Sequence, residues 1–304
     1  MSQSLARTLL VLGIFAVGNV LAQNTMIVPI GGSNIPLGVV PGERFVEVSG
    51  ATKVKDGQYE IKNPYPMDIA ASLLSQKLGV PVSYEGGPLE YSSDVVIQPL
   101  PNTGALPLPS PTVHVIPRSG TLEIHLPVTS AERNAATPQK LIQSVIENHR
   151  AQRNPGNFKL VEFGDGEFSI VMESSADTTG QPVKRQLPLD TVISFPAQDR
   201  TLQATIDLIL KSISASARFS FLQGPGGPPQ SYSTIHVTIG ANAEPARNVL
   251  ARTLHIPGDS KMRWSVTPTP NPPMTGYFFT LVPTKREITD ARGGLQLQLM
   301  VWPK

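Results

Sequence analysis

Histidines are the residues of this chain best suited to bind a metal ion or to move protons, and their spacing favours neither role. No two of them stand in an HExxH motif or at another short ligand spacing, so a metal site would need the fold to assemble them. The chain has no cysteine, which excludes disulfides, thiolate ligands and a thiol nucleophile. We therefore predict no metal site and no cofactor. The five histidines are His114, His125, His149, His236 and His255.

Other catalytic patterns are equally hard to find. No serine stands in a GxSxG or SxxK motif. Asp165 lies between Gly164 and Gly166, where an aspartate commonly serves a turn. The Gly- and Pro-rich residues 224–229 carry prolines where a phosphate-binding loop needs free amides. We predict no catalytic, cofactor-binding or metal-binding residue and no enzyme; the alternative is an enzyme whose groups converge from distant positions.

Composition limits the class of partner. The net charge is +2, from 25 Lys and Arg against 23 Asp and Glu, and the basic residues are scattered. A nucleic-acid partner would need a clustered basic face, so none is predicted. The 304 residues allow two ordinary domains, and the 30 prolines and 25 glycines indicate short elements with many turns.

The N-terminal residues 1–22 have the pattern of a signal peptide. Arg7 gives the positive region, residues 8–21 are apolar, and cleavage is expected after Ala22. The alternative is a membrane anchor, but the apolar run is shorter than the ~20 residues that a spanning helix needs. The prediction is a periplasmic or secreted protein with no stable membrane span after cleavage.

Two later segments share one order of predicted elements, β-α-β-β-α-β-β. In residues 191–283, a strand from Val192 ends at Pro196, and Asp199 and Asn242 are expected to cap the two helices. In residues 57–174, Thr137 followed by Pro138 should open the second helix. The apolar stripes expected for the four helices are Met67, Ala70, Ala71, Leu74 and Leu78; Leu141, Ile142, Val145 and His149; Leu202, Ile206, Ile209 and Ile213; and Ala246, Val249, Leu250 and Leu254.

The strand that ends in Phe195-Pro196-Ala197-Gln198, followed by a Leu-led helix and a strand, resembles the STN family, the secretin and TonB N-terminus short domain. Residues 57–174 look like a divergent second copy. The resemblance implies an α+β fold of two tandem β-α-β-β-α-β-β domains, each with a small sheet and two helices. STN domains stand at the periplasmic front of secretins and TonB-dependent transducers, where they contact partner proteins and perform no chemistry.

Connecting segments complete the predicted organisation. Residues 23–56 form an extended Gly/Pro-rich arm, and residues 175–190 form a linker. The Pro-rich insertion 86–118 is either a docking arm or a surface loop with an extra hairpin of 95–97 against 113–116. The tail, 284–304, alternates Leu and Gln, so it is a strand that either pairs within the chain or is offered to another protein.

The functional prediction follows from the resemblance and from the missing motifs. We expect an exported, non-catalytic envelope protein, associated with a secretion or TonB system, that binds other envelope proteins or itself through sheet edges. The alternative is a periplasmic ligand or glycan binder with a site between the two units. The aromatic residues considered for sugar stacking are Tyr84, Tyr91, Tyr232 and Trp302.

Overall fold

The computed structural model describes residues 50–99, 113–129, 131–132, 136–217, 219–223, 230–255, 262–269 and 276–284. These residues belong to one compact unit, residues 44–304. The predicted signal peptide and residues 23–49 of the arm lie outside the described residues. So do residues 100–112 of the insertion, the loop 224–229 and residues 285–304 of the tail.

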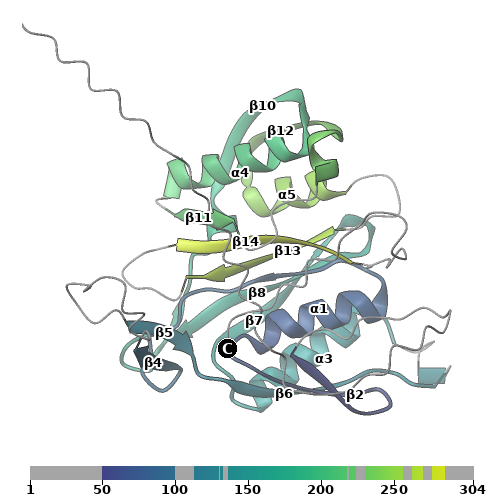
Figure 1. Ribbon diagram of the computed structural model, residues 1–304, viewed down its shortest axis with the longest axis vertical. Coiled ribbons are helices and arrows are strands. Elements are labelled where there is room, and N and C mark those ends of the chain that lie inside the picture. Colours follow the sequence, from purple (N-terminus) through teal and green to yellow (C-terminus); the bar gives the residue numbers. More distant parts are fainter. Residues whose placement is uncertain are drawn as a thin grey trace, which may run out of the picture. The chain divides into compact units, whose positions relative to one another are not determined.

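Two sets of seven elements follow one another in the same order, and we refer to them as the first and second repeats (Figure 1). The first repeat contains β2 (Gln58–Asn63), α1 (Pro66–Leu78), β3 (Val82–Glu85), β6 (Gly120–His125), α3 (Pro138–Ala151), β7 (Asn157–Phe163) and β8 (Glu167–Ala176). The second contains β10 (Val192–Thr201), α4 (Leu202–Ala217), β11 (Ser220–Gln223), β12 (His236–Pro245), α5 (Ala246–Leu254), β13 (Met262–Pro268) and β14 (Gly276–Pro283).

Further strands extend the first repeat. β1 (Ala51–Lys55) pairs with β2, and β9 (Pro182–Lys184) pairs with β8. The insertion contributes β4 (Val95–Pro99) and β5 (Val113–Pro117), which pair as an antiparallel hairpin, so the predicted extra hairpin is confirmed.

Strand pairing is also the same in the two repeats. The first and third strands of each repeat pair antiparallel, as β2–β6 and β10–β12. The other three strands lie in the orders β3-β8-β7 and β11-β14-β13, with the first pair parallel and the second antiparallel. The fold is therefore α+β, as the sequence predicts.

The sequence predicts a small sheet in each repeat, but the two three-stranded sets join into one sheet. β13 of the second repeat pairs parallel with β3 of the first, through Ser265 opposite Tyr84 and Val266 opposite Glu85. The result is one seven-stranded sheet in the order β11-β14-β13-β3-β8-β7, with β9 beside β8. A strand edge in each repeat is satisfied by the other repeat, and this removes two exposed edges from the protein.

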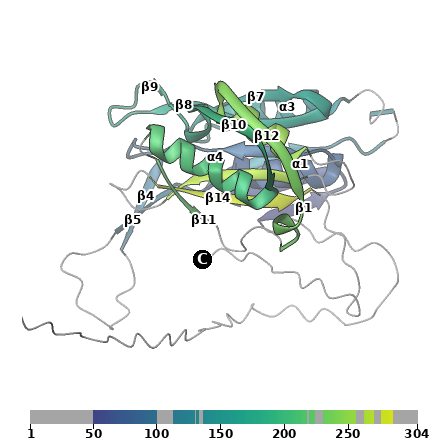
Figure 2. The same cartoon turned by 90° about the horizontal axis from the view of Figure 1, so that it is seen from above.

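The helices cover opposite faces of this central sheet. Tyr84 of β3 packs in the core with α1 and α3, whereas the next residue, Glu85, contacts Arg247 of α5 on the other face. Figure 1 shows the resulting layers: α4 and α5 lie on one side of the sheet with β10–β12 beyond them, and α1 and α3 lie on the other with β2–β6 beyond. In Figure 2, seen from above, β10, β12 and α4 lie over the sheet. Alternation of side chains along a strand makes both faces of β3 interior.

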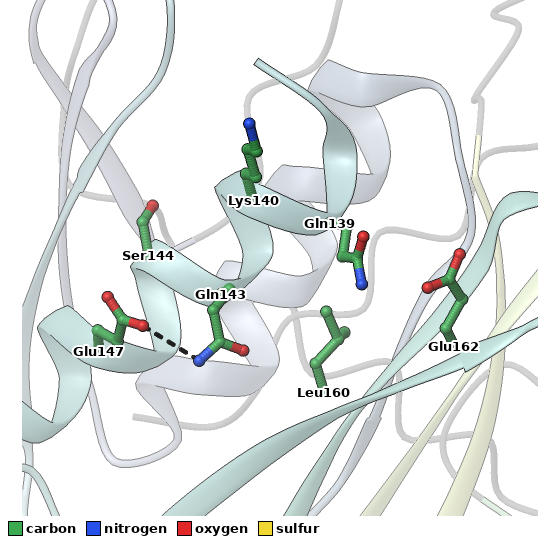
Figure 3. A pocket seen from close by; sticks show the side chains of 7 residues that line it. All are labelled: Gln139, Lys140, Gln143, Ser144, Glu147, Leu160 and Glu162. Atoms are coloured by element: carbon green, nitrogen blue, oxygen red, sulfur yellow. Dashed lines mark hydrogen bonds between the residues drawn. The ribbon is translucent and has the colours of Figure 1, made fainter. Parts of the chain in front are cut away.

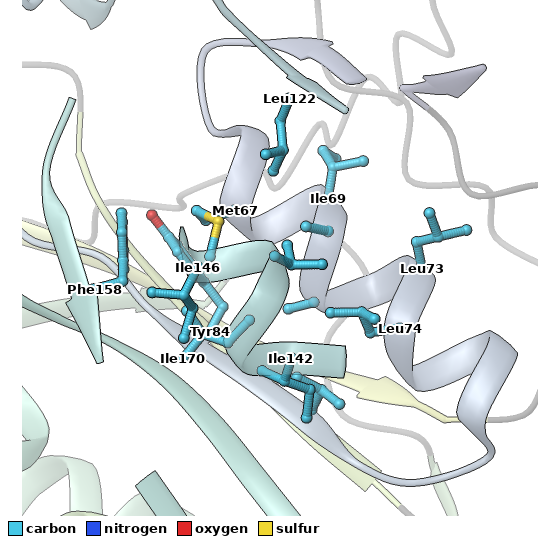
Figure 4. Packing of buried hydrophobic residues seen from close by; sticks show 14 of the residues in the cluster. Met67, Ile69, Leu73, Leu74, Tyr84, Leu122, Ile142, Ile146, Phe158 and Ile170 are labelled. Atoms are coloured by element: carbon cyan, nitrogen blue, oxygen red, sulfur yellow. The ribbon is translucent and has the colours of Figure 1, made fainter. Parts of the chain in front are cut away.

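Apolar stripes with helical spacing place the helices, as expected. In α1 the residues Met67, Ala70, Ala71 and Leu74 are buried, and they meet Ile142 and Ile146 of α3 and Ile170 of β8 in the core of the first repeat (Figure 4). The predicted stripes of α4 and α5 are likewise buried. Burying each leucine, isoleucine, valine or methionine of these stripes stabilises the fold by about 1.5–3 kcal/mol relative to exposure.

Helix starts agree with the sequence only in the first repeat. Thr137 caps α3 by accepting a hydrogen bond from the Lys140 amide at 3.3 Å. The predicted caps of the second repeat are wrong, because Asp199 and Asn242 lie inside β10 and β12. The Thr201 side chain instead accepts from the Ala204 amide at the start of α4.

Pro196 does not end its strand either. β10 continues to Thr201, and its register with β12 shifts between Phe195 and Gln198, so a bulge accommodates the proline. The sequence shows the proline, but it does not show that β12 pairs with β10 on both sides of it. This pairing favours a bulge over a strand end.

Replacing Thr137 by alanine is expected to lower the free energy of unfolding by about 1 kcal/mol, because the substitution removes the hydroxyl that accepts a hydrogen bond from the Lys140 amide. Urea denaturation followed by circular dichroism measures the change. Ser144→Ala, at an exposed position of the same helix, is the control and should cost less. Equal stability of the Thr137 variant and the native chain would show that the cap does not stabilise the helix.

Candidate functional site

The histidines are dispersed over the structure. His149 is buried in α3, and His125 and His236 are exposed on the corresponding strands β6 and β12. His236 Nδ1 lies 3.1 Å from Asp199 Oδ2, and His255 Nδ1 lies 3.1 Å from Glu167 Oε1. The side chain of His114 lies outside the description. Within the described ranges, no three His, Asp or Glu side chains lie where they could hold a metal ion.

The strongest concentration of buried charge lies between the repeats, where β3 meets β13 and α5. Glu85 is 1% exposed, and its carboxylate accepts hydrogen bonds from Arg247 Nε at 2.7 Å and Arg247 Nη2 at 2.6 Å. Ser169 Oγ and Trp264 Nε1 also donate to Glu85 Oε1, at 3.1 and 3.3 Å. Four donors thus compensate a carboxylate that has lost its water, which is the condition for burying a charge.

Arg247 is held from two sides. Its Nη1 lies 2.8 Å from Asp190 Oδ1, so that one guanidinium joins β3, α5 and the segment before β10. Burial by itself lowers the pKa of Arg247, but the Glu85 and Asp190 carboxylates more than offset this and the pKa is raised. Arg247 therefore stays charged and fixes the two repeats to each other.

A second polar cluster lies on the opposite face of the same junction. Ser265 Oγ donates to Asp68 Oδ1 at 2.8 Å, and Arg263 Nη1 lies 3.8 Å from the same oxygen. Burial raises the pKa of Asp68, against the influence of Arg263 and Ser265. Asp68 lies in the first turn of α1, where an acidic side chain also favours the helix.

These contacts argue against a ligand site between the repeats. Paired strands and buried ion pairs occupy the junction, and two of the aromatic residues considered for sugar stacking are buried, Tyr84 at 2% and Tyr232 at 4% exposure. Tyr91 is half-buried, and Trp302 lies outside the described residues. Tyr84 and Tyr232 are therefore not available for sugar stacking.

A groove at the edge of the central sheet is the better candidate. β7 is the last strand of the sheet order, and α3 runs beside it. Between them lies a groove of about 440 Å³, shown in Figure 3. We call it the α3–β7 groove, and it is lined by Gln139, Lys140, Gln143, Ser144, Glu147, Leu160 and Glu162.

The groove combines an apolar floor with polar walls. Leu160 points from β7 towards α3, and it packs partly against the core of the first repeat. The five helix residues are exposed: three are uncharged, Lys140 is basic and Glu147 is acidic. Gln143 Nε2 donates to Glu147 Oε1 at 3.2 Å. An edge strand offers main-chain amides and carbonyls, and a helix beside it offers side chains, so the groove suits an extended segment that adds to the sheet.

Sequence patterns alone did not single out this groove. β7 is predicted only as one of the strands that close residues 57–174, and the prediction for α3 covers only its start at Thr137 and its apolar stripe. A polar helix face followed by a hairpin is the available signal, but it does not say which strand of the hairpin ends the sheet.

In the described part of the chain, no helix has the length and apolar character needed to cross a membrane. No protein-family model, no curated protein and no solved structure matches this chain.

Proposed function

We propose that this chain is an exported, non-catalytic envelope protein that binds other proteins at the edge of its central sheet, in the α3–β7 groove. One observation carries the proposal: β7 is the last of the described strands in the sheet order, and a groove with an apolar floor and polar walls lies directly beside that edge. The buried Glu85–Arg247 pair at the junction, by contrast, is occupied by its own hydrogen bonds.

The assignment of the repeats to STN-like domains is part of this proposal. It is supported by the element order β-α-β-β-α-β-β, which occurs twice, and by strand pairing that is the same in each repeat. Export is supported by the sequence of residues 1–22, and the association with a secretion or TonB system by the resemblance. A fold of this kind is used for binding in the resembled family, although fold by itself is a weak guide to function.

Capture of envelope proteins tests the proposal. The chain from Gln23 onward, used as bait under mild crosslinking, is expected to retain one or a few specific proteins. Gln143→Arg places a long charged side chain in the groove and should reduce capture about tenfold or more, as for loss of a well-packed contact. Mass spectrometry with isotope labelling measures the ratio.

The matched control adds the same charge to another exposed helix position, Ser216→Arg at the end of α4, and should capture as the native chain does. Recovery of no protein, or equal recovery with both variants, would refute binding through the groove. The N-terminal residue of the protein isolated from the cell envelope tests export separately, and it should be Gln23.

A further inference from the structure

The junction between the repeats is a head-to-tail contact between two strands, and the strands that correspond to these two stand at the ends of the described sheet. β13 and β7 are the corresponding strands of the two repeats, and so are β3 and β11. The junction pairs β13 with β3. In the sheet order of the described strands, β11 stands at one end and β7 at the other.

Strand lengths support this correspondence. β3 and β11 each have four residues, and β13 and β7 each have seven. Each short strand lies parallel to the middle strand of its repeat, and each long strand lies antiparallel to that middle strand. A β7 strand therefore presents the same kind of edge, in the same direction, that β13 presents to β3.

The side chains of the junction show what such a contact contains. Ser83 and Glu85 of β3 point away from the helices of their own repeat and towards α5, where Ser83 Oγ accepts from the Trp264 amide at 3.1 Å. They fill the space between β13 and Arg247, the second residue of α5. The second residue of α3 is Gln139, and it lines the α3–β7 groove. The groove is the unfilled counterpart of the filled junction.

β11 carries an apolar side chain suited to that groove. Phe221 packs on its own repeat, against Tyr277 and Phe279. Leu222, the next residue, points to the opposite face, as Ser83 and Glu85 do, and it is 52% exposed. An exposed leucine on an edge strand is a position that a partner strand covers.

From this we infer that the protein associates head-to-tail with a second copy of itself: β11 of one copy pairs parallel with β7 of the next, and Leu222 enters the α3–β7 groove beside Leu160. The inference rests on the proposed binding role of the groove and names its occupant. Because the contact is heterologous, each copy keeps one free end of each kind, and association continues into a ring or a filament.

Two variants block the two ends separately. Leu222→Glu places a charge on β11, and Gln143→Arg fills the groove of α3. Sedimentation velocity and light scattering should show that the mass of the native protein rises with concentration. Each variant alone should have a dissociation constant for self-association raised about tenfold or more, and it should therefore stay monomeric at concentrations where the native chain associates. Val192→Glu is the matched control for Leu222→Glu, because Val192 is 55% exposed on a strand outside the central sheet, and it should associate as the native chain does.

Mixing the two blocked variants is the decisive measurement. The Leu222→Glu chain keeps an open groove and the Gln143→Arg chain keeps a native β11, so an equimolar mixture should form a dimer and nothing larger. A cysteine-free chain allows a second readout, since Leu222→Cys in one copy and Gln143→Cys in another should form a mixed disulfide and the chain supplies no competing thiol.

Three outcomes would overturn the inference. The first is a native protein that stays monomeric at every concentration. The second is loss of association through Leu222→Glu alone, with Gln143→Arg without effect, which would indicate that β11 pairs with β11. The third is a monomer that associates only after residues 285–304 are removed, which would assign the groove to the chain's own tail. A monomer that still captures an envelope protein through the groove would keep the proposed function and refute only the self-association.

Discussion

Replacing Arg247 by leucine is expected to lower the free energy of unfolding by about 3–5 kcal/mol, the usual cost of leaving a buried charge without its partner. Glu85 is 1% exposed and receives two of its four hydrogen bonds from Arg247. Trp264 and Ser169 remain as donors, but neither carries a charge. Denaturant unfolding at neutral pH, followed by tryptophan fluorescence, measures the loss.

The α5 helix supplies its own control. Arg252 also forms a bidentate ion pair, with Glu244, but the Arg252 side chain is 47% exposed. Arg252→Leu should therefore cost about 1 kcal/mol or less. Equal losses for the two arginine variants would mean that burial does not set the strength of the Glu85–Arg247 pair.

The double variant Glu85→Leu with Arg247→Leu separates the pair from the packing. It should recover much of the stability lost in Arg247→Leu, because the Glu85 carboxylate is no longer left buried without its charged partner. A double variant as unstable as the single one would show that the junction depends on the ion pair itself.

Acidification from pH 6.5 to pH 4 is expected to destabilise the protein by up to about 3 kcal/mol through His149. His149 is 2% exposed, and its ring meets the Phe158 ring edge-on at 5.1 Å. Burial, with a smaller effect of the Arg150 charge, lowers the pKa of His149 to about 4. The unfolded chain binds a proton at this position below about pH 6.5, whereas the folded chain does so only near pH 4, so the stability falls as the pH falls through this window.

Comparison of two proteins isolates this effect. The free energy of unfolding of the native chain and of His149→Leu is measured by urea denaturation between pH 7.5 and pH 4, and the difference between the two curves should shrink or reverse on acidification. Burial raises the pKa of Asp68, which gives the opposite dependence, a stability lost as the pH rises, but Asp68 is the same in both proteins. A native and a His149→Leu curve that run parallel would refute the assignment.

Local elements were predictable because their signals lie within a few residues of one another. Leu202, Ile206 and Ile209 recur with helical spacing and are buried in α4 as expected. Gly164 and Gly166 flank the connection between β7 and β8, where the sequence predicts a turn around Asp165. Thr137 before Pro138 gave the start of α3 for the same reason. Such patterns act on the backbone of their own segment, whatever the rest of the chain does.

Caps and strand ends were predictable only where no competing partner existed. Asp199 and Asn242 are good capping residues, yet both belong to the long β10–β12 pair, whose ladder takes up the main chain that a cap would need. Cross-strand hydrogen bonds over ten residues outweigh one side-chain bond of about 1 kcal/mol. The register of β10 with β12 decided where α4 and α5 begin.

The sequence by itself determined the order of elements, the apolar faces of the four helices and the α+β class, because periodicity and turn residues are local properties of the chain. Only the tertiary structure decided that β13 joins β3 and that β7, among the described strands, stands at the end of the sheet beside the α3–β7 groove. Strand pairing is a choice between edges that are far apart in the chain: Glu85 and Arg247 are separated by 162 residues, and neither shows its partner in the residues around it. Which edges are paired and which remain open is a property of the whole fold, and the candidate site follows from it.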